Sequence, residues 1–242
     1  MNKAHLALDS HLHNSRELSS TSSVREIEWP VPTDLPITSL IQLFTEVENA
    51  LHDTGGVLVQ FVCITSGRGS EHTAMDMAWA AATVLGRDIL VVNATSSFSP
   101  SPVQASAQPR IGGPVDSSAL SVQLEPHMIK VAGHGLYVAN LRDVYRGNRA
   151  LAATDEIIAN LRKLSPRMDM IVIAGPPAEI DPFAATLARH VDGNVLVIEA
   201  EETRRSDAIR MRQILSRCGR PLLGTFLNNR RSHIPQWLRR WL

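Results

Sequence analysis

One stretch, residues 57–73, constrains the fold more than any other part of the chain. It opens with an apolar run rich in β-branched residues, from Val57 to Ile64, which is typical of a buried strand in a parallel sheet. A turn with two glycines follows, at Gly67 and Gly69. An alanine-rich run with high helix propensity then begins at Thr73. This stretch therefore predicts a central strand, a tight turn and a helix in direct succession.

The same layout is that of a phosphate-binding loop, in which backbone N–H groups and a helix N-terminus face an anion. The candidate residues for such a cradle are Gly67, Arg68, Gly69, Ser70 and Thr73. A P-loop also needs a lysine followed by Ser or Thr at the start of the helix, and this stretch contains no lysine. We therefore expect the shape of a nucleotide site without its main phosphate-binding charge, and Arg68 is the one residue that could replace it.

Composition excludes several classes of protein. A net charge of 0 and a pI near 7.1 argue against a general nucleic-acid binder. No apolar run approaches the roughly 20 residues of a membrane span, and the first residues lack the apolar core of a secretory signal. Cys63 and Cys218 are too few for a disulfide framework, so we interpret both as buried free thiols. The chain is expected to be cytoplasmic, with peripheral attachment to the inner membrane as an open alternative.

The chain divides into three parts. Residues 1–33 are polar, with a Ser/Thr-rich centre, and predict a disordered N-terminal arm. Residues 34–229 alternate apolar strand patterns with helical patterns, which predicts an α/β domain. Residues 230–242 form a basic tail that contains tryptophan. The alternation favours a doubly wound, mostly parallel sheet with helices on both faces.

The remaining elements of the domain are predicted from periodicity and from helix start and stop signals. The helices are expected at residues 36–52, 154–164, 182–190 and 203–218. The strands are expected at residues 89–94, 170–174, 194–199 and 222–228, with a weaker candidate at 131–139 in which His134 is interpreted as a turn residue. Residues 95–118 are rich in Ser, Pro and Gly and predict a long loop.

The tail carries an apolar stripe. Its large apolar residues recur at helical spacing with Arg239 and Arg240 between them: Trp237, Leu238, Trp241 and Leu242. Such a stripe either packs on the domain itself or meets a membrane surface or a partner helix. Both interpretations stay open from the sequence.

Several short motifs occur in an order that resembles that of a known protein family. They are Ile64-Thr65-Ser66, Asn93-Ala94-Thr95, Gly175-Pro176-Pro177, residues 191–198, Thr203-Arg204-Arg205 and residues 223–228. Over about residues 36–240 the chain resembles the cytoplasmic domain of bacterial tyrosine kinases, the autokinases of capsule and exopolysaccharide export. These belong to the deviant-Walker class, with cell-division and chromosome-partition ATPases. The resemblance implies a sheet of the P-loop NTPase type, and it adds Asn228 to the relic nucleotide site.

The departures from this family fall on its chemistry. His72 or Thr73 stands where the family has the P-loop lysine. Asn93 and Thr95 stand where the second strand normally ends in Asp-x-Asp, and Ala174 replaces the aspartate of Asp-Thr-Pro-Pro. We therefore predict no catalytic residue and no metal site. Two acidic residues near the turn, Glu71 and Asp76, are interpreted as surface charges.

Two further family features are absent from the sequence. The family ends in a cluster of tyrosines, whereas this chain has only Tyr137 and Tyr145. The family's oligomer-forming helix carries a glutamate and two arginines, whereas residues 36–51 contain no arginine. The chain is therefore identified as a degenerate member of the kinase family.

The resemblance implies a role in the biosynthesis and export of a polysaccharide, such as capsule, exopolysaccharide or holdfast-type material. Our first hypothesis is a pseudokinase without a cofactor that regulates an inner-membrane polysaccharide co-polymerase or synthase component. The alternatives are an atypical active ATPase or protein tyrosine kinase, which would require ATP and Mg²⁺, and a partition-type positioning protein. A homo-oligomer is compatible with each hypothesis, and nucleic acid is not an expected partner.

Overall fold

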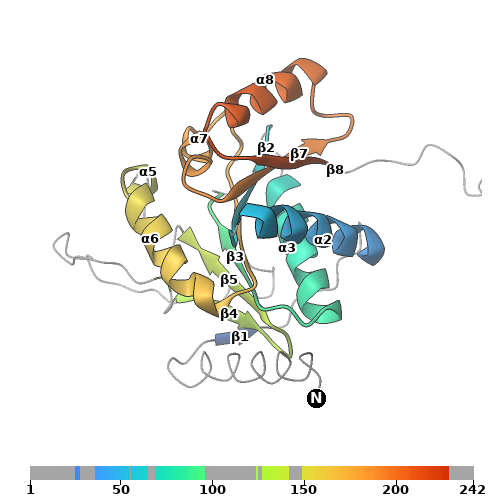
Figure 1. Ribbon diagram of the computed structural model, residues 1–242, viewed down its shortest axis with the longest axis vertical. Helices are drawn as coiled ribbons and strands as arrows, with labels where there is room; N and C mark the ends of the chain where they lie inside the picture. Colours follow the sequence, from blue (N-terminus) through green and yellow to red (C-terminus); the bar gives the residue numbers. More distant parts are fainter. Residues whose placement is uncertain are drawn as a thin grey trace, which may run out of the picture.

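The computed structural model describes residues 25–27, 36–54, 56–64, 69–95, 124, 127–141 and 149–228. Eight strands form one sheet in the order β1-β4-β5-β3-β6-β2-β7-β8 (Figure 1). Their bounds are β1 Arg25–Ile27, β2 Leu58–Cys63, β3 Ile89–Asn93, β4 Ile129–Val131, β5 Leu136–Asn140, β6 Met170–Ala174, β7 Gly193–Glu199 and β8 Leu222–Asn228. All neighbouring strands are parallel except β4 and β5.

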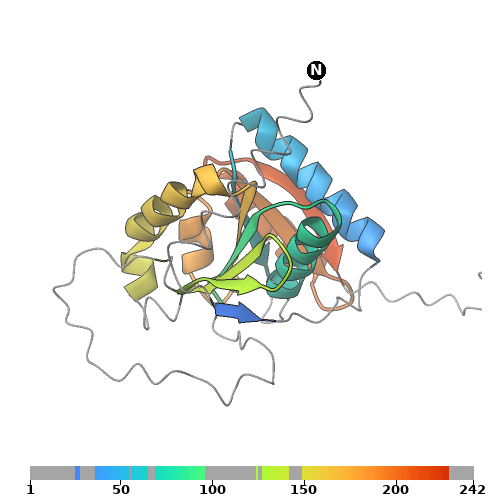
Figure 2. The same ribbon diagram turned by 90° about the horizontal axis from the view of Figure 1, so that it is seen from below.

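Helices cover both faces of this sheet. The α-helices are α2 Ile37–Thr54, α3 Gly69–Val84, α5 Arg149–Ala152, α6 Thr154–Leu164, α7 Phe183–Leu187 and α8 Arg205–Ser216. Helices α2 and α3 pack into one apolar cluster with the sheet, whereas α6 and α7 lie in a cluster on the opposite face (Figure 2). A third, smaller cluster joins α7 and α8 to β2 and β7. The predicted doubly wound α/β architecture is confirmed.

The central position of β2 follows from its composition. All six of its residues are buried, and it lies between β6 and β7. A strand that is covered on both faces must be apolar on both, which explains why its sequence is a continuous apolar run interrupted only by Gln60. Helix α3 begins at Gly69, four residues before the predicted start at Thr73.

The structure differs from two of the predictions in detail. The single weak strand expected at 131–139 is instead an antiparallel pair, β4 and β5, joined by a turn that contains His134. Gly133 has φ +77° in this turn, a backbone conformation that favours glycine and breaks the strand. Residues Arg25–Ile27 were expected to be disordered, but they form β1 and pair in parallel with β4.

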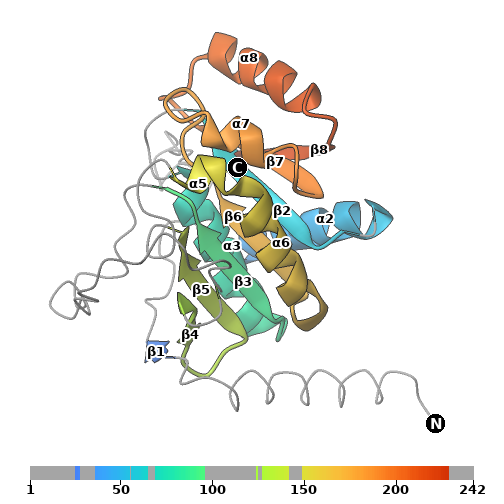
Figure 3. The same ribbon diagram turned by 90° about the vertical axis from the view of Figure 1, so that its left-hand side faces the viewer.

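The other residues of the N-terminal arm lie outside the described residues. The same holds for 96–118 of the predicted loop, for 119–123 after it and for the tail 230–242. Within the part of the chain that is described, no helix is long and apolar enough to cross a membrane. Strands β1 and β8 lie at opposite edges of the sheet (Figure 3).

Two polar side chains lie inside the core and anchor the short helix α7. Gln60 of β2 and Asn194 of β7 are register partners, and neither has any exposed surface. Gln60 Nε2 donates to Ala184 O at 3.1 Å, and Asn194 Nδ2 donates to Ala188 O at 3.1 Å. Both accepting carbonyls belong to α7 or to the residue that follows it, so these amides fix where α7 lies on the sheet.

Asp192 joins three elements at the start of β7. Its Oδ2 accepts hydrogen bonds from Val57 N at 3.0 Å and Leu58 N at 2.9 Å, which fixes the beginning of β2. Its Oδ1 accepts a hydrogen bond from Arg162 Nη2 of α6 at 2.6 Å. Gly56 is required beside it, because a methyl group there would lie 2.3 Å from Asp192 Cβ.

These contacts also determine the charge state of Asp192. Burial raises the pKa of this carboxyl, but the hydrogen bonds from Arg162 and from the two backbone amides outweigh burial and hold the pKa below its usual value. A carboxyl whose pKa is lowered in the folded state stabilises that state fully above its unfolded pKa of about 3.9. The stabilisation is lost as the pH falls through the lowered, folded-state pKa.

We expect Asp192→Asn to lower the free energy of unfolding by about 2 to 3 kcal/mol at neutral pH, because a hydrogen-bonded charge is lost. Thermal melting should show this as a drop on the order of 4 to 12 °C for a chain of this length. The difference from wild type should shrink as the pH falls below about 3.9.

The matched control is Asp155→Asn. Its carboxyl is 94% exposed and lies 3.7 Å from His190 Nδ1, so its loss should change stability by less than about 0.5 kcal/mol. Equal melting temperatures for Asp192→Asn and wild type at neutral pH would contradict the role given to Asp192.

Candidate functional site

The candidate site lies where the carboxyl ends of β2, β3, β6 and β7 meet the first turn of α3. Strand β2 ends at Cys63 and α3 begins at Gly69, so the strand brings the helix start to this edge of the sheet. Ligands of doubly wound sheets bind at such an edge. Of the predicted cradle residues, Gly67 and Arg68 lie outside the described residues, whereas Gly69, Ser70 and Thr73 lie within α3.

The Ser70 hydroxyl forms a hydrogen bond inside the protein. Ser70 is 1% exposed, and its Oγ donates a hydrogen bond to Gly175 O at 2.8 Å. This bond ties the first turn of α3 to the residue that follows β6. Gly175 N in turn donates to Phe61 O of β2 at 2.8 Å. The segment that the family resemblance associates with a metal-binding aspartate is therefore fixed by backbone contacts.

Glu71 is the residue that the sequence interpretation placed wrongly. It was interpreted as a surface charge, but it is only 5% exposed. Its Oε1 accepts a hydrogen bond from Asn93 Nδ2 at 3.1 Å, and its Oε2 accepts one from Thr95 Oγ1 at 3.2 Å. Asn93 Oδ1 also accepts the backbone N–H of Thr95 at 2.7 Å. The two positions where the resemblance implies metal-binding aspartates thus bind a glutamate of the same chain.

A second carboxyl group reaches the start of α3. Glu199 ends β7, is 7% exposed and lies against Gly69, where a methyl group would come within 2.8 Å of Glu199 Oε1. A carboxylate is favourable near a helix N-terminus because the free N–H groups there carry partial positive charge. The same position would attract a phosphate in a nucleotide-binding protein. The sequence signal for Glu199 was an acidic residue at the end of an otherwise apolar strand.

The remaining predicted site residues lie deeper or farther away. Thr73 has no exposed surface, and its Oγ1 finds no hydrogen-bond partner among the described residues. Asn228 ends β8 and is the register partner of Glu199. Its carbonyl accepts the N–H of Ala200 at 2.9 Å. Ala174 ends β6 as the register partner of Asn93, with no exposed surface.

Neither of the two described lysines lies at this edge in the position of a P-loop lysine. The two described lysines are elsewhere: Lys130 lies on β4, 5.9 Å from the centre of the Tyr137 ring, and Lys163 lies on α6. Over the described ranges, no three side chains of His, Cys, Asp or Glu are grouped so that they could hold a metal ion. Glu71 and Glu199 are two carboxyl groups that the structure places near the helix start.

The cysteine at this edge is not an activated nucleophile. Cys63 is 1% exposed, and burial raises the pKa of its thiol above the ordinary value, although contact with Ser70 works in the opposite direction. Its Sγ lies 3.4 Å from Ser70 Oγ. A thiol with a raised pKa has little thiolate at neutral pH, so Cys63 acts as a small packing residue.

Comparison with known proteins finds similarity to solved structures but not to any family profile or curated sequence. The kinase domain of VpsO superposes with a TM-score of 0.63 at 18% identity, covering 81% of this chain and 96% of that domain. The kinase domain of the Escherichia coli tyrosine kinase ETK superposes with a TM-score of 0.64 at 16% identity, covering 91% of this chain and 96% of that domain.

A nucleotide-bound protein shares the same architecture. The septum site-determining protein MinD from Pyrococcus horikoshii OT3, complexed with Mg-ADP, superposes with a TM-score of 0.52 at 16% identity. The match covers 75% of each chain. Likeness at this level of identity establishes the fold: the chain has the P-loop NTPase type of fold, and bacterial tyrosine kinase domains are among its structural neighbours.

Proposed function

We propose that this chain is a catalytically inactive relative of the bacterial tyrosine kinase domains, and that it acts by binding a partner. The observation that carries the proposal is the buried Glu71, which is held by Asn93 and Thr95 at 3.1 and 3.2 Å. A kinase site at this place would need free carboxylates for Mg²⁺ and a cation for the phosphates. Here the polar groups of the edge bind one another.

Electrostatics support the same conclusion. A nucleoside triphosphate brings several negative charges to the helix N-terminus, where Glu199 already lies against Gly69. Each charge-assisted hydrogen bond that a normal site would make is worth about 1.5 to 3 kcal/mol. Losing the lysine and three acidic positions together removes an amount comparable to the roughly 8 kcal/mol of a micromolar affinity.

The biological setting comes from the motif resemblance and from the kinase-domain neighbours. On that basis the partner is an inner-membrane co-polymerase or synthase component of polysaccharide export, and the chain regulates that component as a cytoplasmic, membrane-peripheral subunit. The hydrogen bonds of the buried site are compatible with an intact kinase-like fold. The outer surfaces of this fold remain available for docking. This role requires no cofactor.

An active ATPase or tyrosine kinase is the second candidate. The observation that favours it is the fold shared with MinD, whose structure contains Mg-ADP. Under this alternative Arg68, in the glycine turn, would take the place of the lysine. A partition-type positioning protein would need the same nucleotide binding.

Thermal melting with Mg-ATP separates the two candidates. If no nucleotide binds, 1 mM Mg-ATP should shift the melting temperature by less than about 1 °C, because a ligand stabilises only a state that it binds. A site with an affinity of 10 μM would instead add about 2.7 kcal/mol at that concentration. Mg²⁺ alone and Mg-ADP are the matched controls.

A rise of several degrees with Mg-ATP, together with ATP hydrolysis that disappears in Arg68→Ala, would overturn the proposal. Deletion of the gene should reduce surface polysaccharide in the host bacterium. If deletion leaves the polysaccharide unchanged while nucleotide still fails to bind, the site interpretation stands and the polysaccharide setting is wrong.

Ser70→Ala gives a second, independent prediction. In an active P-loop protein the loss of this hydroxyl impairs Mg²⁺ and phosphate binding. Here it should lower the free energy of unfolding by about 1 to 2 kcal/mol, because Gly175 O loses its buried hydrogen bond, and it should leave the polysaccharide phenotype unchanged.

The matched control for this variant is Ser216→Ala. Its hydroxyl bonds to Arg212 O at 2.8 Å on the exposed side of α8, so its removal should cost less than about 0.5 kcal/mol. If the Ser70→Ala protein is still folded but cells that carry it make less surface polysaccharide, the hydroxyl binds a ligand.

A further inference from the structure

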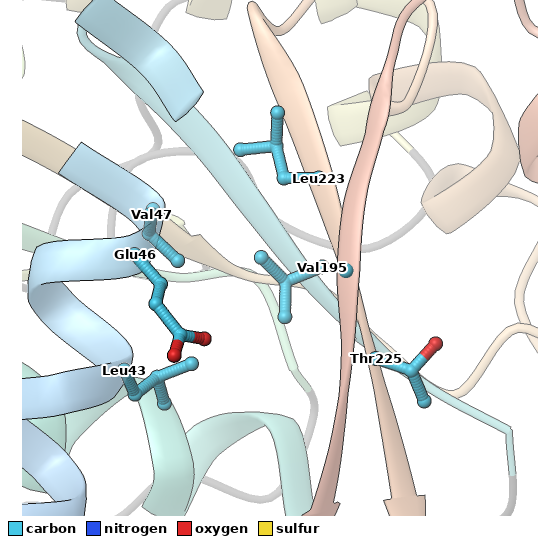
Figure 4. A pocket seen from close by; sticks show the side chains of 7 residues that line it. Leu43, Glu46, Val47, Val195, Leu223 and Thr225 are labelled. Atoms are coloured by element: carbon cyan, nitrogen blue, oxygen red, sulfur yellow. The ribbon is translucent and has the colours of Figure 1, made fainter. Parts of the chain in front are cut away.

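A small hollow lies between α2 and β8 at one edge of the sheet (Figure 4). Its volume is about 50 Å³, and its apolar lining comes from Leu43 and Val47 of α2, Val195 of β7 and Leu223 of β8. Glu46 extends from α2 into the gap between the helix and the strand (Figure 4). The hollow is therefore apolar inside and acidic at its rim.

The hollow exists because β8 has a glycine at this point. A methyl group built on Gly224 would meet no atom within 4 Å, so the space beside it is open. Its φ is not in the left-handed region, so a residue with a side chain could adopt the same backbone conformation. The register of β7 and β8 shifts nearby, between Asn194 and Val195. A glycine within a strand is typical either of a bulge, such as this register shift, or of a site that another segment approaches closely.

The rim charge has no basic partner in the described chain. Glu46 is exposed, and its Oε1 accepts a hydrogen bond from Gln42 Nε2 at 2.9 Å. Among the described residues it forms no ion pair, and α2 itself contains no lysine or arginine. An occupant with a basic residue next to an aliphatic one would complement both the rim and the lining.

The chain itself supplies such a segment. It continues from 229 to 242 beyond β8, and this segment includes Leu238 followed by Arg239 and Arg240 but contains no acidic residue. The hollow at Gly224 lies four strand residues before Asn228, a distance of roughly 13 Å. The residues from 229 to 237 can span up to about 30 Å, so Leu238 can reach the hollow.

We propose that the C-terminal segment of the same chain covers this hollow, with the Leu238 side chain inside it and Arg239 against Glu46. The size of the space selects the side chain. A cavity of about 150 Å³ accommodates a benzene ring, so a space of about 50 Å³ accepts the end of an aliphatic chain but not an indole. Trp237 and Trp241 then lie outside the hollow. This inference is independent of the proposed function.

A disulfide trap in the full-length chain tests the proposal. The pair Glu46→Cys and Arg239→Cys is introduced together with Cys218→Ser, while Cys63 is kept because it is 1% exposed. Under mild oxidation we expect an intramolecular disulfide in most monomers. Adding Gly224→Val, which fills the hollow, should slow the formation of this disulfide at least tenfold.

The matched control is Leu227→Val in the same background. Leu227 also lies on β8, is 50% exposed and does not line the hollow, so the rate of disulfide formation should change less than twofold. Leu238→Asp provides a second route that changes no described residue, and it should slow the reaction as strongly as Gly224→Val. Circular dichroism of each variant confirms that it is folded.

Three results would overturn the inference. Equal rates with and without Gly224→Val and Leu238→Asp would mean that the cysteines meet by random encounter. A disulfide that forms only between two chains would make a second copy the occupant. Binding of the chain to vesicles with 30% phosphatidylglycerol that depends on Leu238, without the intramolecular disulfide, would assign the segment to a membrane surface.

Discussion

The carboxyl group of Asp192 holds together elements that are far apart in the sequence. It accepts the first two N–H groups of β2, pairs with Arg162 of α6 and directly precedes β7. Because β2 is central, fixing its start also fixes the register of the strands on either side. The far end of β2 brings the first turn of α3 to the ends of its neighbours. A single anion at the amino end of β2 therefore helps to determine the geometry of the candidate site at the carboxyl end of the same strand.

Much of the fold could be predicted because apolar periodicity reflects burial directly. The strands at 170–174 and 222–228 and the helix at 154–164 have the predicted bounds, since a Gly or Pro lies at or near one end of each: Gly175, Pro221 and Pro166. The pair β4 and β5 was predicted as one strand because a turn with positive φ at Gly133 interrupts an otherwise continuous apolar pattern. The strand β1 could not be predicted, since three residues carry too little periodicity.

The candidate site was only partly predictable from the sequence. The sequence indicated a helix after the glycine turn, although α3 begins four residues before the predicted start. It also located the positions Asn93, Thr95 and Ala174, because these lie at or just after the ends of apolar runs. It could not show that Glu71 turns inward, since a charged residue in the first turn of a helix is most often solvated. The burial of Glu71 depends on two partners more than 20 residues away, at 93 and 95. Gln60 and Asn194 were missed for the same reason: their partners lie in α7 and on the residue that follows it, and only the folded chain brings them together.

The two outermost strands of the sheet differ greatly in how firmly they are attached. Seven intervals of about 4.8 Å separate β1 from β8, so these strands lie roughly 34 Å apart. A pulling force applied through them would act across the strands and break backbone pairs one after another. Strand β1 has three register pairs with β4, whereas β8 has six with β7. Mechanical load should therefore detach β1 first. The carboxyl ends of the central strands, where Glu71 lies, should stay intact.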